Sequence, residues 1–219
     1  MPGITATVIG ATGLIGGNLV DLLQQDSSVE TVRVVVRRPV QFSHSKVEVK
    51  LVNFSDPESF KLAIDGSDAV YCAVGTTQKK VKGDKEAYRK VDYDIPLHAA
   101  RFCAETGCQK FLLVSSVGAD SKSNNFYLKL KGEVEDDIKL LPIPMIAIFR
   151  PSILLGNRNE TRPGEKIGQV VMQAFSFLLT GSWRKYKPIH AREVALAMIK
   201  ASHQHEEGIY LYEYNRMKP

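Results

Sequence analysis

A tyrosine and a lysine four residues apart are the side chains of this sequence best suited to chemistry. Tyr127 and Lys131 fall in a helix-like stretch, where four-residue spacing puts two side chains on one face. A free tyrosine has a pKa of about 10, and a neighbouring ammonium group would favour its phenolate and bring that pKa nearer neutrality. Tyr127 would then serve as a general acid or base. The alternative is a surface pair, since this spacing often occurs by chance.

Two adjacent serines, Ser115 and Ser116, lie upstream at the end of an apolar, strand-like run. A serine hydroxyl beside Tyr127 could hold a substrate oxygen on which negative charge develops during hydride transfer. The serines therefore favour a proton-transfer site over a surface pair. Either serine could serve, and the residue types leave them as competitors.

A second pattern, near the N-terminus, suits a dinucleotide. The apolar run 4–9 leads into Gly10, and Gly13 and Gly16 follow before an amphipathic stretch. Gly10 permits a tight turn, Gly13 lets backbone N–H groups approach phosphate oxygens, and Gly16 allows a helix to pack close to the strand. The N-terminus of that helix supplies unpaired N–H groups and a positive dipole end. We expect the pyrophosphate of a nucleotide to bind here.

Two arginines indicate which nucleotide this is. Arg37 and Arg38 follow the run 32–36, where an NAD-preferring site would usually present an acidic residue to the adenosine ribose. Guanidinium groups bind phosphate bidentately and stay charged, which suits the extra 2′-phosphate of NADP. The alternative is an exposed arginine pair without a ligand.

Six apolar, strand-like runs alternate with helix-like segments along the chain. This alternation predicts parallel βαβ units and an α/β fold with a doubly wound parallel sheet, the Rossmann fold. Right-handed crossovers put helices on both faces of such a sheet, and ligands collect at the carboxyl ends of the strands where the strand order reverses. The predicted strands are 4–9, 32–36, 47–51, 69–74, 111–115 and 144–149.

The candidate residues follow predicted strands, so the fold would bring them to one edge of the sheet. The first glycine loop follows 4–9, a small-residue turn around Gly75 follows 69–74, and the serines end the run that begins at 111. Close approach by a cofactor would explain Gly75, although an ordinary turn between a strand and a helix needs no ligand.

The length of 219 residues suits a single NAD(P)-binding domain over 1–219. Its core would be 1–150, and segments within 151–219 would form a small C-terminal substrate-side region. The stretch 208–213 predicts a late edge strand that could close the sheet or pair with another subunit. We therefore expect a monomer or a homodimer.

Composition indicates the environment of the protein. The three cysteines include no CxxC pair and no Cys/His cluster, which predicts reduced thiols and no metal site. No apolar run approaches the roughly 20 residues that span a bilayer, and no basic-then-apolar leader precedes the first strand. We expect a cytoplasmic protein with no membrane partner.

The basic charge of the chain suits an anionic ligand. A formal net charge of +5 could attract nucleic acid, but it also suits a polyanionic cofactor. The basic and aromatic run 183–187 has the composition of a single-strand-binding face but is too short for an extended stacking groove. We therefore do not expect nucleic acid as a partner.

The order of the glycine loop, the serine pair and the Tyr127/Lys131 pair resembles that of atypical short-chain dehydrogenase/reductases. The chain is most similar to the Tat-interacting-protein-type NADPH-binding oxidoreductases, and the resemblance covers most of residues 4–200. It is carried by the segments 74–77, 115–120, 127–135, 149–151 and 162–165.

This resemblance implies roles for individual residues. Tyr127 and Lys131 would be the reactive pair and would also contact the cofactor. Ser116 would be the substrate-orienting serine, with Ser115 as its competitor. Arg37 and Arg38 would bind the 2′-phosphate. The resemblance assigns Thr12, Gly13, Leu14 and Ile15 to the pyrophosphate, Val74 and Gly75 to the adenosine side, and Leu154 and Arg162 to further cofactor contacts.

The first hypothesis for function is an NADPH-dependent oxidoreductase acting on a small carbonyl substrate. Tyr127 would donate a proton to the carbonyl oxygen while hydride passes from the nicotinamide C4 to the carbonyl carbon. Ser116 would hydrogen-bond that oxygen, and Lys131 would also hold the nicotinamide ribose.

Two alternatives compete with it. One is an NADPH-binding regulatory protein that reports redox state to a partner, and the presence of Tyr127 and Lys131 argues against it. The other is nucleotide-sugar epimerisation with the same three side chains, for which the short stretch after Arg150 leaves little room.

Overall fold

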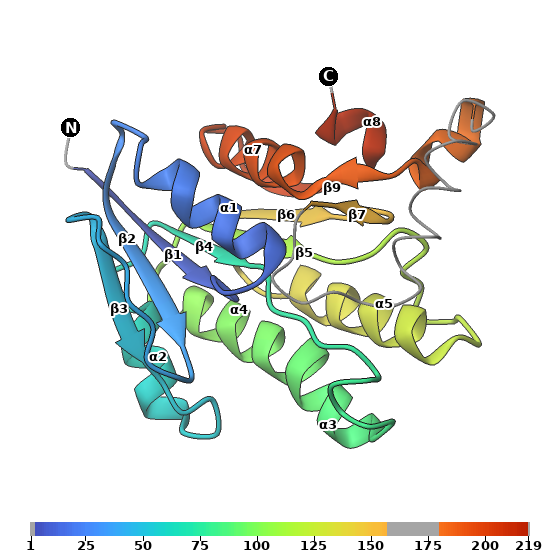
Figure 1. The fold of residues 1–219 in the computed structure, drawn as a ribbon, viewed down its shortest axis with the longest axis horizontal. Helices are drawn as coiled ribbons and strands as arrows, with labels where there is room; N and C mark the ends of the chain where they lie inside the picture. The colour runs from blue at the N-terminus through green and yellow to red at the C-terminus, as the bar shows by residue number, and fades with distance from the viewer. Residues whose placement is uncertain (1–2, 157–179, 219) are drawn as a thin grey trace.

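A seven-stranded parallel sheet organises the computed structural model, which describes residues 3–156 and 180–218 (Figure 1). The strand order is β3-β2-β1-β4-β5-β6-β9, and every neighbouring pair is parallel. This confirms the doubly wound Rossmann fold. The strands are β1 (Ile4–Ile9), β2 (Val29–Val36), β3 (Val47–Leu51), β4 (Ala69–Cys72), β5 (Lys110–Val114), β6 (Met145–Phe149) and β9 (Gly208–Tyr212).

Helices cover both faces of the sheet (Figure 1). One face carries α1 (Leu14–Leu23) and α7 (Ala191–Ser202), and the other carries α2 (Pro57–Ile64), α4 (Ile95–Glu105) and α5 (Phe126–Lys139). Side chains alternate between these two layers along each strand. Val8, for example, belongs to the core beneath α1 and α7, whereas Ile9 belongs to the core beneath α2, α4 and α5.

The chain between β4 and α4 is helical but irregular. It forms α3 (Lys85–Arg89), then a π-helical turn, η1 (Lys90–Asp94), which continues into α4. Asp84 begins α3, because its side chain accepts hydrogen bonds from the Glu86 and Ala87 N–H groups. A π-helical turn holds one residue more than an α-helical turn, which changes the direction in which its side chains point.

Two short strands after β6 form a second, two-stranded sheet. The strand β7 (Leu154–Leu155) pairs with β8 (Ile189–His190), and the 3₁₀ helix η3 (Gly181–Tyr186) and the short α8 (Tyr214–Met217) lie near them. The late edge strand is confirmed as β9, which pairs with β6. Among the described residues no helix is long and apolar enough to cross a membrane.

Candidate functional site

The turns after β1 and β4 meet at the point where the strand order reverses. Gly10 has a φ of +88°, and a Cβ there would lie 2.7 Å from the backbone of Ala73 and Val74. Only glycine fits this contact without moving the chain that follows β4. The strand β4 ends at Cys72, and the Ala73 N–H still donates a hydrogen bond to the Ile9 carbonyl oxygen at 2.9 Å. A doubly wound sheet binds its ligand at this crevice.

The first turn of α1 opens directly onto this crevice. A Cβ on Gly16 would lie 2.1 Å from the Gly10 carbonyl oxygen, so the helix packs against the turn as the sequence predicts. The N-cap residue is Gly13, which has no side chain to occupy the N–H groups of the first turn. Thr12 is exposed, whereas the Ile15 side chain is buried in the core, so Ile15 offers a pyrophosphate only its backbone.

The segment after β6 reaches the same glycine loop. Gly156 comes directly after β7 and packs against α1. A Cβ on Gly156 would lie 3.0 Å from Leu14 Cδ1. Leu154 is partly buried against the core beneath α1. Leu14 therefore lies beside the segment that carries Leu154, and the cofactor contacts that the resemblance implies for both leucines stay predictions. Arg162, the other residue of this part, lies outside the described residues.

The two arginines stand at the carboxyl end of β2. Arg37 and Arg38 are both exposed, and neither forms an ion pair within residues 3–156 and 180–218. Both interpretations of the pair, a 2′-phosphate site and a solvated surface, require this exposure.

The N-terminus of α5 positions Tyr127. The Asn125 side chain caps the helix by accepting hydrogen bonds from the N–H groups of Tyr127 at 3.0 Å and Leu128 at 3.1 Å. The Tyr127 ring packs edge to face on Tyr88, with 6.2 Å between the ring centroids. Tyr127 is half-buried in the first turn of the helix, and Lys131 follows one turn later.

Lys131 is buried and paired with an acidic residue that the sequence pattern did not identify. Its Nζ lies 2.9 Å from Asp92 Oδ1, and the side chains are only 5% and 2% exposed. The other oxygen, Oδ2, accepts a hydrogen bond from the Thr76 N–H at 2.7 Å. Burial lowers the pKa of Lys131, but the charge of Asp92 and the influence of Tyr127 outweigh it, so the pKa lies above its ordinary value. Lys131 therefore carries a positive charge at neutral pH.

The two serines occupy different environments. The Ser115 hydroxyl donates to Glu135 Oε1 at 2.5 Å, and Glu135, fully buried, also accepts a hydrogen bond from Arg150 Nε at 2.9 Å. Ser116 is half-exposed, and its hydroxyl lies 3.4 Å from the Val117 carbonyl oxygen, a long contact. The geometry therefore favours Ser116 as the serine that is available to a substrate.

The loop that carries Ser116 is fixed against α5. A Cβ on Gly132 would lie 2.1 Å from the Ser121 backbone nitrogen and 2.2 Å from the Asp120 carbonyl carbon. The loop after β5 can thus cross α5 only at a glycine. Gly132 directly follows Lys131, so the crossing lies next to the reactive pair.

The sequence patterns did not identify two buried residues near this site, Asp92 and Glu135, or the partly buried Arg150. Glu135 had a usable signal, because it continues the four-residue spacing of Tyr127 and Lys131 along α5. Asp92 had none, since its approach to Lys131 depends on how η1 packs against α5 in three dimensions.

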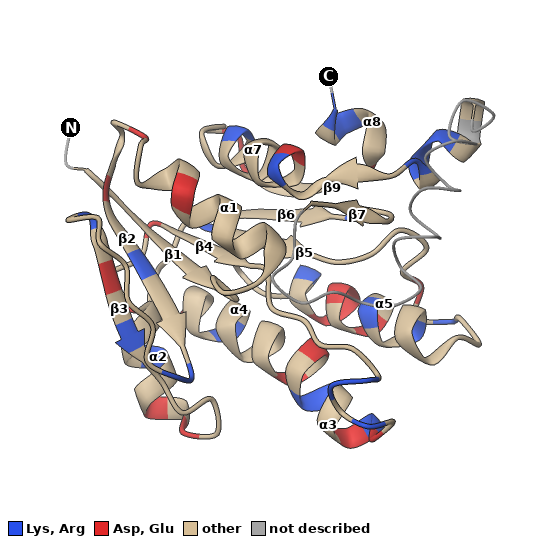
Figure 2. Ribbon diagram, viewed as in Figure 1, with Lys and Arg blue, Asp and Glu red and all other residues tan. Residues whose placement is uncertain are grey.

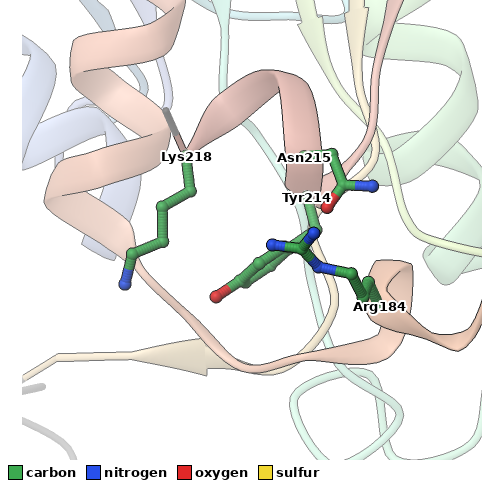
Figure 3. Close-up of a pocket in the computed structure, with 4 residues that line it drawn as sticks. All are labelled: Arg184, Tyr214, Asn215 and Lys218. Atoms are coloured by element: carbon green, nitrogen blue, oxygen red, sulfur yellow. The ribbon is translucent and has the colours of Figure 1, made fainter. Parts of the chain in front are cut away.

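Two shallow cavities lie elsewhere on the described surface. One, of about 310 Å³, is lined by Arg184 of η3 and by Tyr214, Asn215 and Lys218 in and beside α8 (Figure 3). Basic residues lie on both of these elements (Figure 2). The other, of about 340 Å³, is lined by Arg89, Tyr93, Ser121, Glu133, Asp136 and Asp137. Neither cavity includes Tyr127 or the first glycine loop.

The sequence matches the family model described as NAD(P)H-binding over residues 10–139. It is 34% identical over 198 residues to the protein FMP52, mitochondrial, of Candida albicans, covering 88% of this chain and 85% of that one. It is 32% identical over 195 residues to the protein HTATIP2 of Rattus norvegicus, covering 88% and 78%. Because FMP52 is named as mitochondrial, the cytoplasmic location expected from the sequence stays a prediction.

Solved structures share the fold at low sequence identity. A short-chain dehydrogenase/reductase superfamily protein from Agrobacterium tumefaciens with bound NAD superposes with a TM-score of 0.71 at 14% identity, covering 95% of this chain and 77% of that one. MoeE5 in complex with UDP-glucuronic acid and NAD gives 0.72 at 15% identity, covering 94% and 75%. The chain thus belongs to the NAD(P)H-binding family, as a homologue of HTATIP2 and FMP52.

Proposed function

We propose that this protein is an NADPH-dependent oxidoreductase that reduces a carbonyl group of a small substrate. The observation that carries the proposal is that Tyr127 and a buried, charged Lys131 lie on the first two turns of α5, where the two groups interact electrostatically. A cation held beside a phenol favours the phenolate that remains after proton donation. A protein that only sensed the cofactor could use Lys131 to hold the ribose, but it would not need a proton donor beside it.

The residues at the crevice suit a dinucleotide. Gly10, Gly13 and Gly16 leave space where side chains would stand, and the first turn of α1 offers N–H groups to the pyrophosphate. Val74 and Gly75 would border the adenosine, and Arg37 and Arg38 would bind the 2′-phosphate. Bound NADPH would supply the hydride for the carbonyl carbon.

The other side chains then complete the reduction. Tyr127 donates its phenolic proton to the carbonyl oxygen as that oxygen gains the electron pair of the breaking C=O π bond. Ser116 donates a hydrogen bond to the same oxygen and stabilises its developing charge. Lys131 stabilises the Tyr127 phenolate and holds the nicotinamide ribose. In the reverse direction Tyr127 accepts the proton from the alcohol.

The test is NADPH consumption over a panel of aldehydes, ketones and quinones. We expect Tyr127→Phe to lose about 100-fold or more of the turnover number, since general acid catalysis is typically worth that much. NADPH affinity, measured by fluorescence titration, should fall far less than the turnover number. The matched control is Tyr210→Phe, which removes a hydroxyl that donates to the Glu207 carbonyl beside β9.

The outcomes separate the competing hypotheses. NADPH binding without Tyr127-dependent turnover of any carbonyl would overturn the proposal in favour of the regulatory hypothesis. Interconversion of nucleotide sugars without net NADPH consumption would favour the epimerase hypothesis.

A further inference from the structure

We propose that Asp92 is a positioning residue for this site: its carboxylate keeps the Lys131 ammonium charged and ties it to the turn that follows β4. The catalytic part of this inference rests on the proposed function. The electrostatic part concerns the protein alone, and it can be tested without cofactor or substrate.

The geometry gives both carboxylate oxygens a specific partner. Asp92 Oδ1 lies 2.9 Å from Lys131 Nζ, and Oδ2 accepts the Thr76 N–H at 2.7 Å. A Cβ on Gly75 would lie 3.4 Å from the same Oδ1, so the carboxylate packs directly beneath the cofactor-side turn. One buried side chain thus joins the turn that would border the adenosine to the helix that carries the reactive pair.

The placement of Asp92 in a π-helical turn supports a functional role. The turn η1 interrupts an otherwise α-helical run between Lys85 and Glu105. π-Helical turns are rare, and they occur frequently at functional sites. Asp92 is the fully buried residue of this turn, at 1% exposure.

The charged and titratable groups around Lys131 come from three elements. They are Asp92 on η1, Tyr127 on α5 and Cys72 on β4. Burial raises the pKa of Cys72 to about 12, so its thiol is neutral at physiological pH. Asp92 is therefore the group among these three that supplies a full negative charge to Lys131.

If the charge of Asp92 is lost, the pKa of Lys131 should fall, so the ammonium loses its proton at a lower pH. In Asp92→Asn the side chain keeps its size, but burial then acts on the ammonium without a countercharge, and buried lysines are known to shift downward by as much as 3–5 pKa units. In the wild type, by contrast, Lys131 should stay protonated beyond pH 10.5, its ordinary value.

The direct test is an NMR titration of ¹³C-lysine-labelled protein, in which the Lys131 signal is assigned with Lys131→Arg. We expect the midpoint of Lys131 to fall by about 2 units or more in Asp92→Asn. The control is Asp94→Asn, the same charge change two residues along the chain, at a side chain that makes no capping hydrogen bond to α4. Equal midpoints in Asp92→Asn and wild type would overturn the proposal. Should Asp92→Asn fail to fold, a wild-type midpoint below 10.5 would overturn it equally.

A second measurement connects the ion pair to turnover. If carbonyl reduction is found, the alkaline limit of kcat should move toward neutral pH in Asp92→Asn and stay in place in Asp94→Asn. A merely structural role would lower kcat equally at all pH values. The electrostatic role of Asp92 and its effect on turnover are tested separately, because the NMR titration needs no carbonyl substrate.

Discussion

At the scale of single residues, two neighbouring serines have separate tasks. Ser115 points toward α5 and ties that helix to β6 through Glu135 and Arg150, whereas Ser116 is left at the sheet edge. Successive side chains of an extended chain point in opposite directions, so adjacent residues at a strand end cannot both face one ligand. The residue types did not decide which serine contacts a substrate. The position of Glu135 favours Ser116, because Ser115 is bound to Glu135.

Substitution by alanine should therefore lower activity at Ser116 and stability at Ser115. Ser116→Ala should lower kcat for carbonyl reduction by about 100-fold, as loss of one donor to a developing oxyanion does, and leave stability almost unchanged. Ser115→Ala should cost about 1–3 kcal/mol of unfolding free energy, because a buried carboxylate loses a hydrogen bond. Steady-state kinetics and urea denaturation of both variants check this. A larger loss of kcat in Ser115→Ala would assign the substrate contact to Ser115 instead.

At the scale of elements, the close crossing of α5 by the loop after β5 sets the relative position of Ser116 and Lys131. Gly132→Ala places a methyl group 2.1 Å from the Ser121 backbone nitrogen, so loop and helix must separate. We expect a loss of about 1–3 kcal/mol of unfolding free energy, the usual cost of overpacking. The matched control is Gly17→Ala in α1, where the nearest atom would be 3.6 Å away and the gain in helix propensity about 0.5–1 kcal/mol. Equal effects of the two substitutions on the denaturation midpoint would contradict the crossing.

Strands and glycine turns could be predicted from the sequence because they depend on local patterns. The apolar runs of β1 and β5, for example, are fixed by burial on both faces, and Gly10 is fixed by its backbone angle. The Asp92–Lys131 ion pair could not be predicted. The two residues lie 39 positions apart, and their approach depends on a π-helical turn whose sequence carries no local signature.

At the scale of the whole molecule, the proposed cofactor site joins elements that are far apart in the sequence. It runs from the arginines after β2, across the turns of β1 and β4, to the first turns of α5. The unfolded chain would offer no such site, so a ligand that binds there stabilises the folded state by mass action. The net charge of +5 further favours an anionic ligand.

Bound NADPH should therefore raise the melting temperature. At 100 times its dissociation constant, a ligand adds about 2.7 kcal/mol, which for a chain of this size corresponds to about 5–10 °C. NADH at the same concentration should give a smaller shift, because it offers no 2′-phosphate to the exposed Arg37 and Arg38. Arg37→Asp should reduce the difference between the two nucleotides, whereas Arg101→Asp, the same charge change on the exposed side of α4, should leave it intact. Equal shifts with NADPH and NADH in the unaltered protein, measured by differential scanning fluorimetry, would remove the arginine pair from the cofactor site and leave the solvated-surface interpretation.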